Sequence, residues 1–139
     1  MNISTKDTTA IAGRALLAAL FLLSGVAKLH APEETLAYIQ ASGLPFPTLA
    51  YAGALGVELG LASLLVLGVQ TRLVAVLMAL FTVVTAVAFH HDLGDQGQFI
   101  NFFKNISIVG GLLQVAAFGG GALSLEAWAA RRRNLRLAR

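Results

Sequence analysis

Four long runs of apolar residues follow one another along the chain, and short polar segments separate them. The runs cover residues 11–29, 49–69, 73–89 and 106–123. Each run has close to the roughly 20 residues that an α-helix needs to cross a hydrocarbon core about 30 Å thick. Because a chain in lipid must satisfy its backbone polar groups within each segment, the pattern predicts transmembrane helices. Their expected bounds are about 10–29, 49–69, 72–91 and 102–123.

The connections between the runs are short, which predicts an antiparallel bundle. The tight turn LGVQTR makes neighbours of the second and third helices, and the polar segment HHDLGDQGQF is expected to be a surface loop. Between the first two runs, Pro32 suits the first position of a helix and Gly43 can end it. We therefore predict an all-α membrane protein of four transmembrane helices, with a short interfacial helix between spans one and two. That helix is either a plain surface connector or a lid over a pocket.

The composition agrees with insertion into a membrane. Of the 139 residues, 57% are apolar and only 12% are charged, and the mean hydropathy is +0.75. We interpret residues 1–139 as a single integral membrane domain whose first run is an uncleaved anchor. The absence of cysteine excludes disulfides, thiolate metal sites and the class of membrane enzymes that work through a cysteine pair.

Positive charge is concentrated on one side of the predicted bundle. With four spans, both termini share a side with the turn between the second and third helices. Eight of the ten Lys and Arg residues belong to that side: Lys6, Arg14, Arg72, Arg131, Arg132, Arg133, Arg136 and Arg139. The positive-inside rule therefore predicts cytoplasmic termini, with residues 124–139 as a basic cytoplasmic tail. A basic cluster directly after a span is typical of contact with anionic lipid, and we expect no nucleic-acid binding.

One carboxylate lies near the middle of the second run. An unpaired Glu58 at that depth would be very unfavourable, so we expect it to be protonated or paired. Arg14 and Lys28 are fourteen residues apart, about 40° from a whole number of turns, and therefore share one face of the first helix. Either cation is within reach of Glu58. Such a pair can serve function, or it can only fix the packing of the helices.

Further polar side chains are expected at the non-cytoplasmic ends of the spans, above the depth of Glu58. We predict a ligand-binding or buried polar cluster of six residues: Arg14, Lys28, Glu58, His90, Lys104 and Asn105. Such a group can hold a proton or donate hydrogen bonds to a carbonyl, while neighbouring phenylalanines wall a flat ring. The alternative is that the terminal lysines reach out to the lipid head groups and the histidines are loop residues. No catalytic residue is assigned.

A metal site is not expected. His30, His90, His91, Asp92 and Asp95 can gather at the outer surface, but they follow no known spacing of metal ligands. Adjacent histidines on a helix also point about 100° apart, so both rarely reach one ion.

The order of the motifs carries a resemblance to a known family. After Arg14, the chain contains SGVAKL, YIQASGLPFP, VELGLASLLVLGVQTRLVA, AFHH and FFKNISIVGGLL, within about residues 11–125. This series resembles the DoxX family of small four-helix membrane proteins. The resemblance implies a bundle in the bacterial inner membrane, and some relatives are linked to quinone-coupled sulfur oxidation or to membrane redox complexes.

Three functions fit these observations. The first is a redox-associated accessory subunit that binds a quinone-like or other small oxidisable molecule in a polar pocket near the outer face. The second is a non-catalytic scaffold or assembly subunit whose buried charges are structural. The third is a pathway for protons or small solutes, which the gap between Glu58 and Arg72 disfavours. Expected partners are membrane lipid and either a redox protein or a second copy of the chain.

Overall fold

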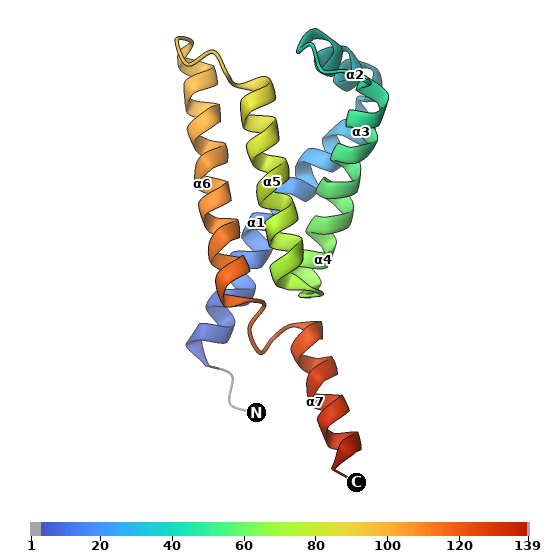
Figure 1. Cartoon of the computed structure of the whole chain (residues 1–139), viewed down its shortest axis with the longest axis vertical. Coiled ribbons are helices and arrows are strands. Elements are labelled where there is room, and N and C mark those ends of the chain that lie inside the picture. Colours follow the sequence, from blue (N-terminus) through green and yellow to red (C-terminus); the bar gives the residue numbers. More distant parts are fainter. Residues whose placement is uncertain (1–3, 139) are drawn as a thin grey trace.

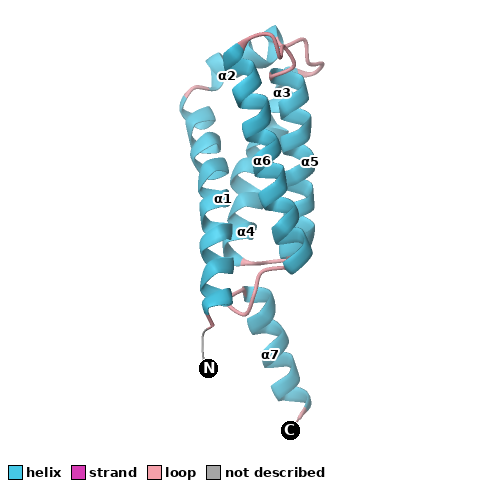
Figure 2. Ribbon diagram, turned by 90° about the vertical axis from the view of Figure 1, so that its left-hand side faces the viewer, coloured by secondary structure: helices cyan, strands magenta, loops and turns pink. Residues whose placement is uncertain are grey.

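The computed structural model describes residues 4–138, which form helices joined by short loops (Figure 1, Figure 2). The elements are α1 (Thr5–His30), α2 (Pro32–Ala41), α3 (Pro47–Leu55), the π-helical segment η1 (Gly56–Leu61), α4 (Ala62–Leu67), α5 (Thr71–Phe89), α6 (Gln96–Phe118) and α7 (Leu125–Leu137). Four helical stretches are long and apolar enough to cross a membrane: α1, the continuous stretch from α3 to α4, α5 and α6. The predicted all-α membrane fold is confirmed. Arg139, which belongs to the predicted tail, lies outside the described residues.

The spans form an antiparallel bundle. The start of α1, the turn between α4 and α5, and α7 lie at one end, which we call the terminal end (Figure 1). At the opposite end lie α2 and the loop between α5 and α6 (Figure 2). The helices α5 and α6 pack extensively against each other, and α1 packs mainly on η1 and α4. Contacts between α1 and α6 are few, so a seam is left between these two helices.

Small residues allow the helices to approach one another in the middle of the bundle. Ala18 of α1 and Ala62 of α4 are fully buried, and such residues let backbones come close. Leu65, Met78 and Leu112 fill the remaining space from three different spans. Many large apolar side chains on the outer faces of all four spans stay exposed, as expected for helices in contact with lipid.

The fourth span differs from the expected 102–123. It begins at Gln96 because Asp95 caps the helix, accepting a hydrogen bond from the Gln98 backbone N–H at 2.8 Å. It ends at Phe118 because Gly119, with a φ of +79°, leaves the helical conformation. Part of the expected surface loop is therefore helical.

The shift of the fourth span changes the depth of its polar residues. Lys104 and Asn105 lie in the third turn of α6 and not in the first. The third span ends at Phe89, so His90 caps the helix and His91 belongs to the loop.

Two short helices lie at the ends of the bundle: α2, which was expected, and α7, which was not. Pro32 starts α2, and Gly43 follows that helix with a φ of +76°. The basic tail, to which no secondary structure was assigned, forms the exposed helix α7. Ser124 caps α7 by accepting a hydrogen bond from the Ala127 backbone N–H at 3.2 Å.

Candidate functional site

A buried ion pair joins the first two spans. The Nζ of Lys28 lies 2.8 Å from the Oε1 of Glu58, and this is the only salt bridge among residues 4–138. Ser24 lies between them, since its hydroxyl accepts a hydrogen bond from Lys28 at 2.8 Å and donates one to Glu58 at 3.1 Å. Of the two expected partners of Glu58, the structure selects Lys28.

The local backbone explains why the pair can form. Glu58 belongs to η1, where a π-helical turn widens the second span, a feature that is frequent at functional sites. Opposite η1 stands Gly25 of α1, and a Cβ at this position would lie only 2.7 Å from the Cδ2 of Leu59. The absence of a side chain at Gly25 therefore lets α1 and η1 approach closely enough for the ion pair.

A cavity of about 590 Å³ opens next to this ion pair, toward the end of the bundle opposite the termini. Five of the six predicted site residues line it: Lys28, Glu58, His90, Lys104 and Asn105. They come from α1, η1, the end of α5, and α6. Most of the remaining wall is apolar and includes Phe21, Phe81 and Phe89. The cavity thus combines an apolar wall with several hydrogen-bonding groups.

The interfacial helix α2 borders the cavity. Tyr38 and Ile39 of α2 line it, and the Tyr38 ring stacks on Phe89 of α5 with centroids 5.3 Å apart and planes at 13°. Another tyrosine, Tyr51 of α3, donates a hydrogen bond to the backbone carbonyl of Lys28 at 3.1 Å. The contacts of Tyr38 and Ile39 place α2 at the cavity, a position that a surface connector and a lid can both have.

The polar groups on the cavity wall differ in their bonding. Lys104 donates a hydrogen bond to Asn101 at 2.7 Å and has no carboxylate partner among the described residues. Burial, followed by the charge of Lys104, lowers the pKa of His90 below its usual 6.5, against a smaller opposing effect of a hydrogen bond with the Phe89 backbone. His90 is therefore neutral at pH 7 and can both donate and accept a hydrogen bond.

Arg14 does not join this group. It lies on the same face of α1 as Lys28, but fourteen residues along a helix span about 21 Å. The guanidinium donates hydrogen bonds to the backbone carbonyls of Leu65, at 3.2 Å, and Leu123, at 2.8 Å. Arg14 is only 1% exposed, so it ties α1 to α4 and to the loop before α7 at the terminal end.

Sequence reasoning missed Ser24, which bridges the ion pair, and Tyr51, which bonds to the backbone of Lys28. Ser24 stands four residues before Lys28, which places the two side chains on one face of α1. This spacing could have identified Ser24 as a partner of Lys28. Tyr51 is 23 residues away from Lys28, so no local sequence pattern indicates the hydrogen bond between them. Within residues 4–138, no three His, Asp or Glu side chains gather in a way that could hold a metal ion.

The fold and the cavity define a small all-α integral membrane protein with a partly polar ligand-sized cavity in its bundle. The family model of DoxX matches residues 9–91, and the chain belongs to the DoxX family. Two Escherichia coli K12 proteins are similar to it over nearly their whole length. Inner membrane protein YphA is 37% identical over 128 residues, which cover 88% of this chain and 91% of the relative. Inner membrane protein YqjF is 34% identical over 121 residues, which cover 87% and 92%. No solved structure matches the chain significantly.

Proposed function

We propose that the protein binds a flat, mostly apolar molecule with carbonyl or hydroxyl oxygens, such as a quinone, in the 590 Å³ cavity. The observation that carries the proposal is the convergence of Lys28, Glu58, His90, Lys104 and Asn105 on a cavity with aromatic walls. Its volume falls within the roughly 300–1,000 Å³ typical of small-molecule sites. Most of the residues that line the cavity belong to the spans, so a lipid-soluble ligand can be held at membrane depth.

The polar groups would act on opposite edges of such a ring. Lys104 and Asn105 of α6 donate hydrogen bonds to one oxygen, and neutral His90 exchanges a proton with solvent at the cavity mouth. The paired Lys28 and Glu58 set the charge of the opposite wall. In this scheme the chain is an accessory subunit of a redox system, and a redox protein partner exchanges electrons with the bound molecule.

We further propose that the terminal end faces the cytoplasm and the cavity faces outward across the inner membrane. Seven of the eight Lys and Arg residues counted for the terminal side lie within residues 4–138 and belong to elements at that end. The names of both relatives place them in the inner membrane. A ligand in the cavity would then be accessible from the outer leaflet.

A scaffold function is the second candidate, and the bonding of the ion pair favours it. Lys28, Ser24 and the Oε1 of Glu58 bond to one another at 2.8–3.1 Å, so the charge of Glu58 has a counter-charge without any ligand. A subunit of this kind would use its buried charges only to lock α1 against η1.

Ligand binding separates the two candidates. We expect saturable binding of a radiolabelled short-chain benzoquinone by the protein in lipid nanodiscs. Replacing Lys104 with alanine removes a charged hydrogen-bond donor and should weaken binding about tenfold, since such a bond contributes roughly 1.5 kcal/mol. Lys6→Ala at the other end of the bundle is the matched control and should bind like the wild type. The absence of saturable binding, or equal binding by Lys104→Ala, Asn105→Ala and wild type, would leave the scaffold as the better account.

A further inference from the structure

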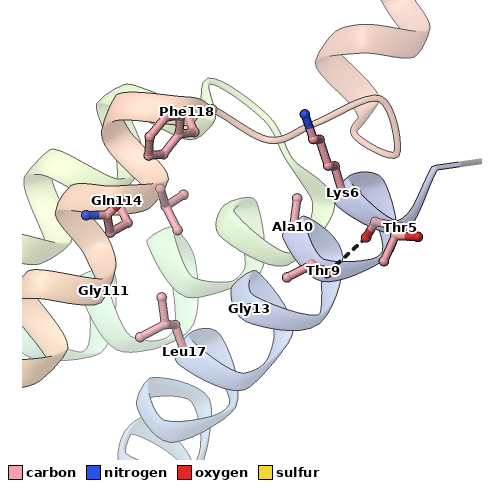
Figure 3. Close-up of a pocket in the computed structure, with 11 residues that line it drawn as sticks. Thr5, Lys6, Thr9, Ala10, Gly13, Leu17, Gly111, Gln114 and Phe118 are labelled. Carbon is pink, nitrogen blue, oxygen red and sulfur yellow. Dashed lines mark hydrogen bonds between the residues drawn. The ribbon is translucent and has the colours of Figure 1, made fainter.

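A second hollow lies between α1 and α6 at the terminal end, away from the proposed ligand cavity. This groove has a volume of about 560 Å³ and shares no lining residue with the other cavity. Figure 3 shows Ala10, Gly13 and Leu17 of α1 facing Gly111 and Phe118 of α6 across the open space. We call it the α1–α6 groove.

Small residues keep the groove open. A Cβ added to Gly13 would meet no atom within 4 Å, so this stretch of α1 leaves space beside α6. Farther into the bundle the groove closes, because a Cβ at Gly111 would lie 3.3 Å from the Cδ2 of Leu17. The groove is therefore a short wedge that opens toward the terminal end. Phe118, with 79% of its surface exposed, stands on its outer wall.

Two basic side chains lie at or beside the mouth of the groove. Lys6 lines it together with Thr5 and Thr9 (Figure 3). Arg72 stands next to the groove residue Gly119, where an added Cβ would lie 3.3 Å from the Arg72 Nε. Within residues 4–138, neither Lys6 nor Arg72 forms a salt bridge.

The two nearby carboxylates are engaged elsewhere. Asp7 accepts hydrogen bonds from Ser4, at 2.6 Å from its hydroxyl, and from the backbone N–H of Ala122 at 3.0 Å. Glu126 accepts one from the backbone N–H of Thr71 at 3.3 Å. The mouth of the groove therefore offers two cations without carboxylate partners, directly below an apolar wedge at the end of two spans.

We propose that the α1–α6 groove is a binding site for an anionic phospholipid. One acyl chain lies along Ala10, Gly13 and Leu17, and the phosphate group lies at Lys6 and Arg72. An acyl chain gains little by moving from lipid into the groove, because both environments are apolar. The selectivity must therefore come from the head group, and basic pockets between spans at the cytoplasmic side are known to bind anionic head groups.

The shape of the groove favours a lipid chain over a helix from a second copy. An α-helix with side chains is about 10 Å wide and would need the seam between α1 and α6 to be open along its length. The contact of Leu17 with the position of Gly111 closes that seam. A flexible hydrocarbon chain can instead end at the contact.

The test is native mass spectrometry of the whole protein, released from micelles that contain equal amounts of phosphatidylglycerol and phosphatidylcholine. We expect the wild type to retain phosphatidylglycerol preferentially. Lys6→Gln and Arg72→Gln should each reduce that preference about fivefold, as the loss of one cation near an anionic head group implies. Added inorganic phosphate should not displace the lipid, because it has no chain to occupy the groove.

The groove itself is tested by filling it. Gly13→Leu should abolish retention of phosphatidylglycerol, whereas Gly110→Leu should retain it like the wild type. Gly110 is the matched control, since a Cβ added there would also meet no atom within 4 Å and the residue does not line the groove. Equal retention of both lipids by the wild type, or full retention by Gly13→Leu, would overturn the proposal. A dimer that disappears in Gly13→Leu independently of lipid would show that a second copy occupies the groove.

Discussion

Lys28 and Glu58 form a pair whose members are unequally buried. The Lys28 side chain is 25% exposed near the end of α1, whereas that of Glu58 is 7% exposed within the second span. Without its partner, Lys28 can extend its charged end toward the lipid head groups. Glu58 has no such route, and its Oε2 atom already has no hydrogen-bond partner among the described residues.

The asymmetry predicts which single substitution is more harmful. Lys28→Met leaves a carboxylate without a counter-charge at membrane depth and should destabilise the protein by roughly 3 kcal/mol. Glu58→Gln should cost less, because the remaining lysine can reach water. The double variant should recover most of the stability lost in Lys28→Met. Thermal unfolding in nanodiscs measures the stability of all three variants. An equal loss of stability in the two single variants would show that neither charge can reach water more easily than the other.

The sequence predicted how deep these residues lie in the membrane, but it did not determine which cation pairs with Glu58. Arg14 and Lys28 both lie on one face of α1, and hydropathy gave no reason to prefer either as the partner of Glu58. The choice depends on which turn of α1 meets η1, where Gly25 permits close approach. Arg14 could not be placed for another reason, because its acceptors are backbone carbonyls, which leave no signature in the side chains.

At the scale of elements, the turn between α4 and α5 depends on a single glycine. Gly68 has a φ of +71° at the end of α4, a conformation that other residues adopt only at a cost. A Cβ there would also collide with the Nη1 of Arg14 and lie 2.5 Å from the Cβ of Ser124. The turn, the arginine of α1 and the cap of α7 therefore share one tightly packed point.

Gly68→Ala should destabilise the protein by roughly 2 kcal/mol or more, since it adds backbone strain to a steric clash. Gly110→Ala should have no effect or should stabilise by about 0.5 kcal/mol, because this helical glycine has open space around it. Thermal unfolding of both variants in nanodiscs checks the contrast. Equal stability of the two variants would mean that the turn is not strained by an alanine.

The bounds of α6 show where hydropathy misleads. Apolar residues continue to Leu123, so the expected span was drawn too far toward the C-terminus. Helix ends are decided by capping and glycine, here Asp95 at the start and Gly119 at the end, more than by hydrophobicity. The short helix α2 was predictable for the same reason, because Pro32 and Gly43 mark its ends.

At the scale of the whole molecule, the two hollows occupy opposite ends of the bundle and share no lining residue. Leu17 and Gly111 close the seam above the α1–α6 groove. The two hollows are therefore not joined along this seam, and a solute or proton pathway between them would need another route. The two proposed sites would place a different ligand at each end of the bundle.

The direction of the bundle in the membrane decides which hollow faces which compartment. The chain contains no cysteine, so single cysteines can be introduced without removing any native one. Glu34 in α2 and Asn134 in α7 are both exposed and lie at opposite ends of the bundle. If the basic end is cytoplasmic, a membrane-impermeant maleimide should label Glu34→Cys in intact spheroplasts, and it should label Asn134→Cys only after the membrane is permeabilised. The cysteine-free wild type is the background control. Labelling of Asn134→Cys in intact spheroplasts would reverse the orientation, and it would move the proposed phospholipid site to the outer leaflet.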